Sequence, residues 1–217
     1  MSRTGNIFID AFSFMTAFLP LLPVAFIFIQ KKYNRVELIL LIILCVFNFT
    51  GNIFSAIPQQ TNGNLNMIAN IFSVIQLVFI LQVCCLAMNK GLKDGINVFL
   101  IVFCTAIFTF YLSNGAGQKR IGIEIFQDLI LVIGPAIVLF DMIQDNSLSI
   151  FNYPVFWIGG GSLFNFFIAL IVNIAGPSIE TLKDSIFILD TANLIRYVFY
   201  TLAVIFTIQK EVEKNTY

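Results

Sequence analysis

The sequence predicts an all-α polytopic membrane protein: one domain, residues 1–217, folded as a bundle of seven transmembrane helices. Composition is the first observation, because 59% of the residues are hydrophobic and only 11% are charged, whereas about 25% of a soluble domain is charged. The second observation is the mean hydropathy of +0.92, which is high for a soluble protein. The third observation is a series of apolar runs of roughly 19 to 27 residues, the length that a helix needs to cross a bilayer.

The predicted spans are separated by loops too short to hold another domain. They cover residues 7–29, 36–57, 65–88, 95–113, 121–143, 151–173 and 183–209. Pro20 and Pro23 predict a kink in the first span, and Pro135 predicts one in the fifth. Residues 159–161, all glycine, predict either close packing of the sixth span against a neighbour or a bend.

The distribution of Lys and Arg predicts an outside N-terminus and a cytoplasmic C-terminus, because cytoplasmic loops carry an excess of basic residues. Seven basic residues fall on the side predicted to be cytoplasmic: Lys31, Lys32, Arg35, Lys90, Lys93, Lys210 and Lys214. Four fall on the other side: Arg3, Lys119, Arg120 and Lys183. We therefore expect a multi-pass protein of the cell membrane, a bacterial inner membrane, with the lipid bilayer as its immediate partner.

Several classes of function are excluded or disfavoured by what the chain lacks. The net charge is zero, which argues against a nucleic-acid partner. No histidine is present, so histidine-ligated zinc sites, serine–histidine triads and histidine proton relays are excluded. We find no nucleophile–base pair and expect no enzyme, no metal site and no cofactor. Four cysteines lie inside the spans and are expected to pack as free thiols: Cys45, Cys84, Cys85 and Cys104.

Polar residues recur at helical spacing in the outer half of six spans, which predicts a polar pocket that opens outward and is closed below. The second span carries Asn48, Asn52 and Ser55, the third carries Asn66, Asn70, Ser73 and Gln76, and the fifth carries Glu124, Gln127 and Asp128. Ser162 and Asn165 lie in the sixth span, Asp10 begins the first, and Asp190 and Asn193 lie in the last.

Arg196 is the most informative of these residues, because it lies in the middle of the last span. A guanidinium at that depth costs about 2.5–3.5 kcal/mol or more and must find acceptors inside the protein. On a helical wheel it shares a sector of about 120° with Asp190, Asn193, Tyr197, Tyr200 and Thr207.

Two interpretations of Arg196 stay open: it binds an anionic ligand group such as a carboxylate or a lipid phosphate, or it forms a bridge to Asp128 or Asp190. Glu124 and Asp128, one turn apart, form a cation or proton site if both are buried, and Glu124 is an interfacial residue otherwise. The candidate ligand-binding residues are Arg196, Asn193, Asp190, Gln76, Asn48, Asn52, Asn70, Asn165, Asp128 and Glu124.

The run Tyr153-Pro154-Val155-Phe156-Trp157 resembles the aromatic wall of microbial rhodopsins, and Asp190 is similar to their counter-ion position. The resemblance implies a seven-helix layout. Retinal needs a lysine in the last helix for its Schiff base, but Leu194 stands four residues after Asp190 and no lysine lies in the interior of a span. A retinal photoreceptor is therefore rejected.

The same run, continued by Ile158 and combined with Glu37-Leu38 at the start of the second span, also resembles short bacterial seven-helix membrane proteins with a Pro-x-Phe-Trp-Ile sixth helix. That resemblance implies a membrane location and sensing, without a chemistry. Seven-helix sugar carriers have a similar length, and Pro58-Gln59 is similar to their proline–glutamine motif, although it occurs only once.

From these features we expect a membrane-embedded binding or sensory protein, receptor-like, with an outward-facing polar pocket. Its expected partners are a small anionic ligand or lipid and a cytoplasmic or membrane protein that receives a signal. The alternative is a small secondary transporter for a polar or anionic solute. An inward polar path below Arg196 would favour the transporter.

Overall fold

The computed structural model describes residues 7–31, 35–56, 63–88, 90–114, 121–144, 150–175 and 182–214. Side chains are described throughout these ranges apart from positions 54–56, 63–70, 90, 92, 108, 111–114, 121, 182, 183 and 208–214. All the regular structure in the described chain is helical, which confirms the predicted all-α class. The helices are α1 (Ile7–Phe18), α2 (Leu21–Ile29), α3 (Val36–Ala56), α4 (Gly63–Cys85), α5 (Lys90–Asn114), α6 (Ile121–Gln144), the short 3₁₀-helix η1 (Ile150–Asn152), α7 (Pro154–Ala175) and α8 (Leu182–Lys214).

Five stretches of the described chain are long and apolar enough to cross a membrane as helices. They are Ile7–Ile29, Val36–Ile53, Gly122–Gln144, Pro154–Ala175 and Asp184–Thr207, and α4 adds a shorter apolar helical stretch, Ile71–Cys85. Large apolar side chains cover the outside of the bundle: Ile101 is 68% exposed, Phe140 65% and Ile174 62%. Such a surface suits hydrocarbon and not water, so the protein is a membrane-embedded helical bundle.

The kink predicted in the first span is confirmed at Pro20. α1 ends at Phe18 and α2 begins at Leu21, and the turn between them is closed by hydrogen bonds from Leu19 N to Thr16 O (3.2 Å) and from Leu22 N to Leu19 O (3.0 Å). Pro20 has no N–H and cannot continue the ladder of α1. Pro23 lies in the first turn of α2, where the missing N–H removes no helical hydrogen bond. By contrast, α6 continues through Pro135 as one helix.

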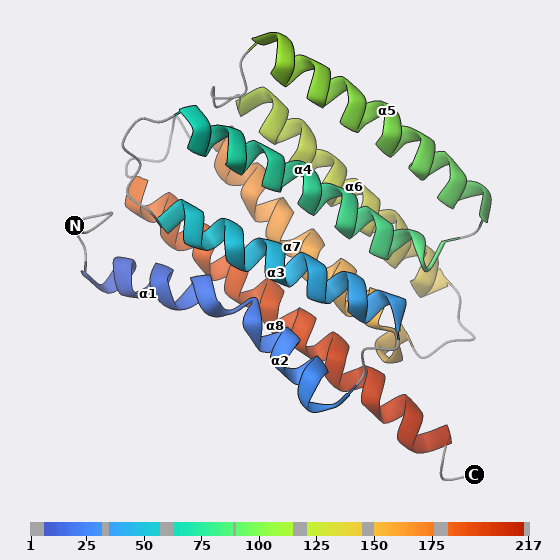
Figure 1. The fold of residues 1–217 in the computed structure, drawn as a ribbon. Helices are drawn as coiled ribbons and strands as arrows, with labels where there is room; N and C mark the ends of the chain where they lie inside the picture. The colour runs from blue at the N-terminus through green and yellow to red at the C-terminus, as the bar shows by residue number, and fades with distance from the viewer. Residues whose placement is uncertain are drawn as a thin grey trace.

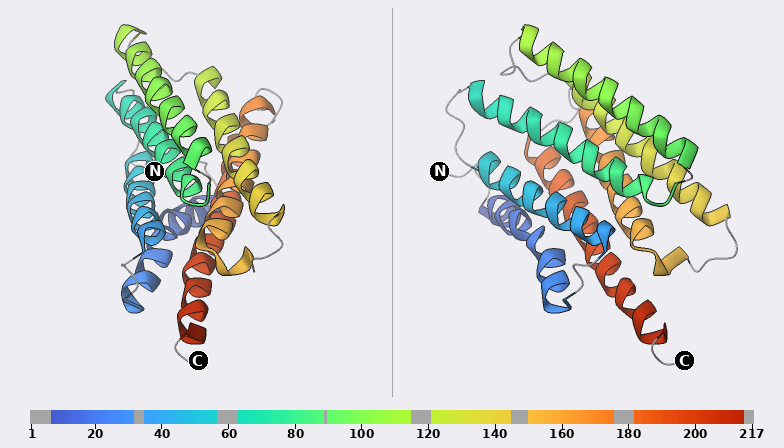
Figure 2. Two further views of the ribbon diagram at one scale, coloured as in Figure 1. Left: turned by 90° about the vertical axis from the view of Figure 1, so that its right-hand side faces the viewer. Right: turned by 45° about the vertical axis from the view of Figure 1, so that its right-hand side comes forward.

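The helices lie side by side in a bundle, with α3, α4 and α5 in front of α6, α7 and α8 in the view of Figure 1. α7 packs against α3, α4, α6 and α8, and its contacts with α6 and α8 are the most extensive between any two described helices, which makes it the central helix. α1 and α2 pack against both α3 and α8, so the first and last parts of the chain are neighbours (Figure 2). α5 lies at the edge of the bundle against α4, and the rings of Phe103 and Phe126, 5.6 Å apart, join it to α6.

The core is built where α2, α3, α4, α6, α7 and α8 meet. Its largest fully buried side chains are Tyr197, Tyr200, Ile27, Leu38, Leu41, Leu44, Leu77, Ile80, Leu131, Ile158, Gln127 and Val83. The two tyrosines from α8 therefore lie in the most deeply buried part of the bundle, together with aliphatic side chains from α2, α3, α4, α6 and α7.

The glycine run of α7 makes a close approach to α8, the first of the two roles that the sequence predicts for it. α7 runs without interruption through residues 159–161. A Cβ atom added to Gly161 would lie 2.7 Å from Phe199 Cβ and 3.1 Å from the carbonyl oxygen of Arg196. Only a residue without a side chain lets the two backbones pack this closely. Gly161 thus fixes the position of the turn of α8 that carries Arg196.

Candidate functional site

Arg196 lies inside the bundle and is only 5% exposed. Its Nη2 donates a hydrogen bond of 2.7 Å to the hydroxyl of Tyr197, and its Cζ lies 4.8 Å from the centroid of the Tyr197 ring and 5.9 Å from that of Phe166 on α7. Its Nε is buried and has no hydrogen-bond partner among the described residues. The guanidinium therefore lies beside aromatic rings, and its Nε–H is left without an acceptor in the described chain.

α3 and α7 complete the surroundings of this guanidinium. Cys45 and Asn48, one turn apart on α3, face α8: the Cys45 thiol lies near Arg196, and the Asn48 side chain lies near the Tyr197 hydroxyl. Asn48 Nδ2 is likewise buried without a hydrogen-bond partner in the described chain. From α7, the Ser162 hydroxyl lies 2.8 Å from that of Tyr200. We define the Arg196 cluster as Cys45, Asn48, Ser162, Phe166, Arg196, Tyr197 and Tyr200.

The two carboxylates considered as bridge partners for Arg196 have other partners. Asp128 accepts a hydrogen bond of 2.7 Å from Asn173 Nδ2 on α7, and Asp190 accepts one from the Ser13 hydroxyl on α1. Within the described residues, the hydrogen-bond partner of Arg196 is a tyrosine hydroxyl and not a carboxylate. The nearest groups that interact with its charge, Tyr197, Tyr200 and Cys45, are neutral at physiological pH. The charge of Arg196 is thus not balanced within the Arg196 cluster.

Three hydrogen-bonded pairs join neighbouring helices at one end of the bundle. Ser73 Oγ on α4 donates to Gln127 Oε1 on α6 at 2.6 Å, next to the Asn173–Asp128 pair, and the Ser13–Asp190 pair joins α1 to α8. Four of these six residues lie in the first halves of their helices, and Ser13 lies just past the middle of α1. Asn173 lies near the end of α7, which runs in the opposite direction. The polar pairs therefore gather at the same end, where α1, α4, α6 and α8 begin.

The opposite end of α7 is aromatic. The Trp157 ring stacks on Phe206 with centroids 5.0 Å apart, contacts Phe199 at 5.7 Å, and donates its Nε1–H to the carbonyl oxygen of Phe151 at 2.8 Å. α7 and α8 therefore meet through polar groups in their middle and through aromatic rings where α7 begins.

A further polar pair lies away from the polar end of the bundle. Gln82 on α4 and Asn97 on α5 are joined by a hydrogen bond of 2.9 Å.

The remaining candidate residues are spread over the bundle. Asn165 is buried on α7, and Asn52, Gln76, Glu124 and Asn193 are half-buried. Glu124 lies close enough to Asp128 for their charges to interact. The hydrogen bond of Arg196 goes to none of them. The side chain of Asn70 lies outside the described residues, as do those of Ser55 and Asn66. The structure thus brings Asn48 to Arg196 and places Asp128 with Glu124 in a second group.

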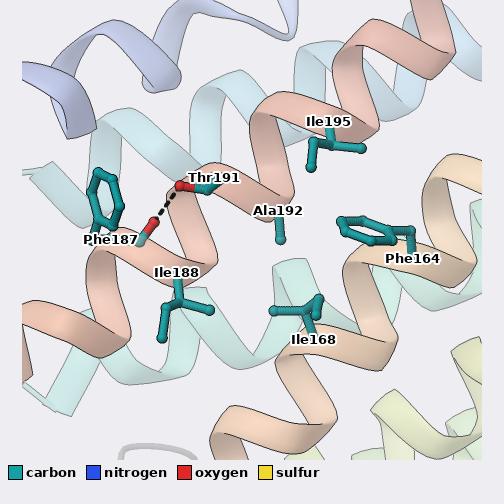
Figure 3. A pocket seen from close by; sticks show the side chains of 7 residues that line it. All are labelled: Phe164, Ile168, Phe187, Ile188, Thr191, Ala192 and Ile195. Carbon is teal, nitrogen blue, oxygen red and sulfur yellow. Dashed lines mark hydrogen bonds between the residues drawn. The ribbon is translucent and has the colours of Figure 1, made fainter.

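A groove of about 220 Å³ runs along the outside of α7 and α8, on a face next to the one that carries Arg196. Its lining is almost entirely apolar: Phe164, Ile168, Phe187, Ile188, Thr191, Ala192 and Ile195. The one hydroxyl in it, that of Thr191, donates to the carbonyl oxygen of Phe187 on its own helix at 2.8 Å (Figure 3). The groove therefore offers no free polar group for recognition and suits lipid chains of the bilayer.

Sequence reasoning missed five residues of these two groups, among them Phe166, whose ring lies near the guanidinium. Tyr197 and Tyr200 share the sector of Arg196 on the helical wheel but are not among the candidates, although a buried Tyr hydroxyl needs a partner. Cys45 lies one turn from Asn48 and faces the guanidinium. Asn173, at the end of the sixth predicted span, partners Asp128. All four cysteines are free, as the sequence predicts.

Metal ligands do not cluster in the described chain: no group of three or more Cys, Asp or Glu side chains there is arranged to hold a metal ion. Comparison of the chain with protein-family models, with curated proteins and with solved structures finds no match.

Proposed function

We propose that this protein is a membrane-embedded binding or sensory protein whose interior, around Arg196, receives a ligand that carries negative charge. One observation carries the proposal: Arg196 is 5% exposed, its Nε has no partner among the described residues, and its hydrogen bond goes to a neutral hydroxyl. A buried charge that the cluster itself does not balance is strongly destabilising. A ligand that supplies the negative charge removes that penalty, so its binding is expected to stabilise the folded protein.

The part of α8 that follows Arg196 supports binding over transport. Tyr200, Ala203 and Val204 are fully buried, and the buried Thr207 donates its hydroxyl to its own helix at the carbonyl oxygen of Ala203, 2.7 Å away. A polar path toward the C-terminal end of α8, the feature that would favour a transporter, is not formed by these side chains. The proposed protein therefore takes its ligand from the end where the polar pairs gather and does not pass it on.

Seven transmembrane spans, an outside N-terminus and a bacterial inner membrane belong to the same proposal. With that topology the polar end of the bundle faces the outside, and Trp157 and its aromatic neighbours face the cytoplasm. A cytoplasmic or membrane partner that reads the ligand-bound state is then expected to contact the loops or the tail on that side. The resemblance to short bacterial seven-helix proteins agrees with a sensory role and remains a prediction.

Native mass spectrometry of the protein purified in mild detergent tests the proposal. We expect a bound small molecule in the native protein and its loss in Arg196→Leu. Arg35→Leu, which removes an arginine that precedes α3, is the matched control and should keep the bound mass. A bound mass that survives in Arg196→Leu would place binding elsewhere and remove Arg196 from the proposal.

A further inference from the structure

Arg196 Nε and Asn48 Nδ2 are buried N–H donors without hydrogen-bond partners in the described chain, and they come from different helices. The Tyr197 hydroxyl accepts from Arg196 Nη2 at 2.7 Å, and the Asn48 side chain lies next to it on the side of α3. Because both side chains meet at this one oxygen atom, we expect a small acceptor beside Tyr197 to reach both unpartnered donors. Buried donors are normally paired, so two of them together indicate a group that brings oxygen atoms.

The charge of the missing acceptor follows from the cluster. Arg196 contributes one positive charge, and the groups nearest to it are hydroxyls and a thiol, which are neutral at physiological pH. A single negative charge balances it. A phosphate dianion would leave an excess negative charge in the same buried volume, where no second Lys or Arg contacts Arg196 in the described chain.

The shape of the acceptor follows from the rings. The Cζ of Arg196 lies 4.8 Å from the centroid of the Tyr197 ring and 5.9 Å from that of Phe166, so aromatic carbon lies on two sides of the guanidinium. Its N–H groups point outward in its own plane, and Nε–H is one of those left to donate. A carboxylate is planar, carries one charge and accepts hydrogen bonds in that plane.

We propose that the Arg196 cluster binds the carboxylate of a small monocarboxylic acid, which accepts hydrogen bonds from Arg196 Nε and Asn48 Nδ2. This rests on the proposed function and adds the chemical class of its ligand. The apolar side chains next to the cluster, above all Phe166, then contact the body of the acid. Asn48 thereby becomes a specificity-determining residue, because it supplies the second donor without adding charge.

Thermal unfolding of the purified full-length protein tests this with acetate, propionate, chloride and inorganic phosphate as probes at equal ionic strength. We expect acetate and propionate to raise the unfolding temperature with saturation, and chloride and phosphate not to. Arg196→Gln should abolish the effect. Asn48→Ala should weaken the apparent Kd about tenfold, the effect of losing one hydrogen bond to a charged group.

Matched controls remove the same chemical groups elsewhere. Arg35→Gln removes an arginine that precedes α3, and Asn97→Ala removes an amide that binds Gln82 on the far side of α4. Both should keep the response of the native protein. Since Arg196→Gln is a change in the core, saturation-transfer NMR with acetate on Asn48→Ala and on the native protein gives a second measurement that does not depend on that variant's folding.

Each outcome decides between the two proposals. Saturation by chloride or phosphate but not by carboxylates overturns the carboxylate assignment and leaves an anion site at Arg196. Carboxylate binding that survives both Arg196→Gln and Asn48→Ala overturns this site. A native protein that responds to no anion, and carries no bound mass that depends on Arg196, overturns the proposed function as well.

Discussion

The hydroxyl groups of Ser162 on α7 and Tyr200 on α8 lie 2.8 Å apart. Both residues are fully buried. This hydrogen bond joins α7 to α8, the helix of the candidate site. The bond fixes the Tyr200 side chain, which lies one turn after Arg196 on α8.

The Ser162–Tyr200 bond is expected to contribute about 0.5–1.5 kcal/mol to the free energy of unfolding. Ser162→Ala and Tyr200→Phe each remove it while keeping most of the packing. In a double-mutant cycle, the second change should therefore cost less in the presence of the first. Additive effects of the two changes would show that the hydroxyls do not interact.

Gly161→Ala is expected to destabilise the protein by about 1–3 kcal/mol, because its Cβ would meet Phe199 Cβ at 2.7 Å and the Arg196 carbonyl oxygen at 3.1 Å. α7 and α8 must then move apart. Gly91→Ala on α5 is the matched control, since a Cβ there has no atom within 4 Å. Thermal unfolding in detergent should show a lower midpoint for Gly161→Ala and an unchanged or higher one for Gly91→Ala. Equal midpoints would contradict the close contact.

Arg196→Leu is expected to leave the protein folded and to raise its free energy of unfolding in ligand-free buffer by about 1–4 kcal/mol, because a buried charge is replaced by an apolar side chain. Arg196→Lys should bind an anionic ligand more weakly than the native protein, since an ammonium group has no planar fork and no Nε–H. Denaturant titration and ligand titration measure the two effects separately. An unfolded Arg196→Leu variant would indicate that the guanidinium is needed for packing.

Orientation is tested with single cysteines at Asn62 and Lys214, introduced after the four native cysteines are replaced. The excess of basic residues predicts that a membrane-impermeant maleimide labels position 62 in intact cells and position 214 only after lysis. The reverse pattern would place the polar end of the bundle in the cytoplasm.

No chromophore is expected to be attached through a lysine, because no lysine lies in the interior of a predicted span and Leu194 follows Asp190 by one turn. The purified protein should therefore show no visible absorption band that hydroxylamine shifts. Such a band would restore the rhodopsin interpretation that the sequence argues against.

Much of the architecture follows from the sequence, because it depends on local properties of the chain. Runs of apolar residues predict helices that a bilayer requires, and five of them are long enough to span one. Pro20 ends α1 for lack of an N–H, and the glycines of α7 permit a close contact. The burial of Arg196 in a helix that faces the protein interior follows from the energy of its charge in hydrocarbon.

The partners of the buried polar groups were decided only by the tertiary structure. Helical spacing tells which face of a helix is polar, but not which helix that face meets or at what height. From the sequence, Asp128 and Asp190 are both possible partners of Arg196. In the structure Asp128 pairs with Asn173 on α7, and Asp190 pairs with Ser13 on α1. Arg196 binds the hydroxyl of its own neighbour, Tyr197. In the part of the chain that the structure describes, α3 and α7 bring Cys45 and Phe166 to the guanidinium and Asn48 to the Tyr197 hydroxyl, and no carboxylate.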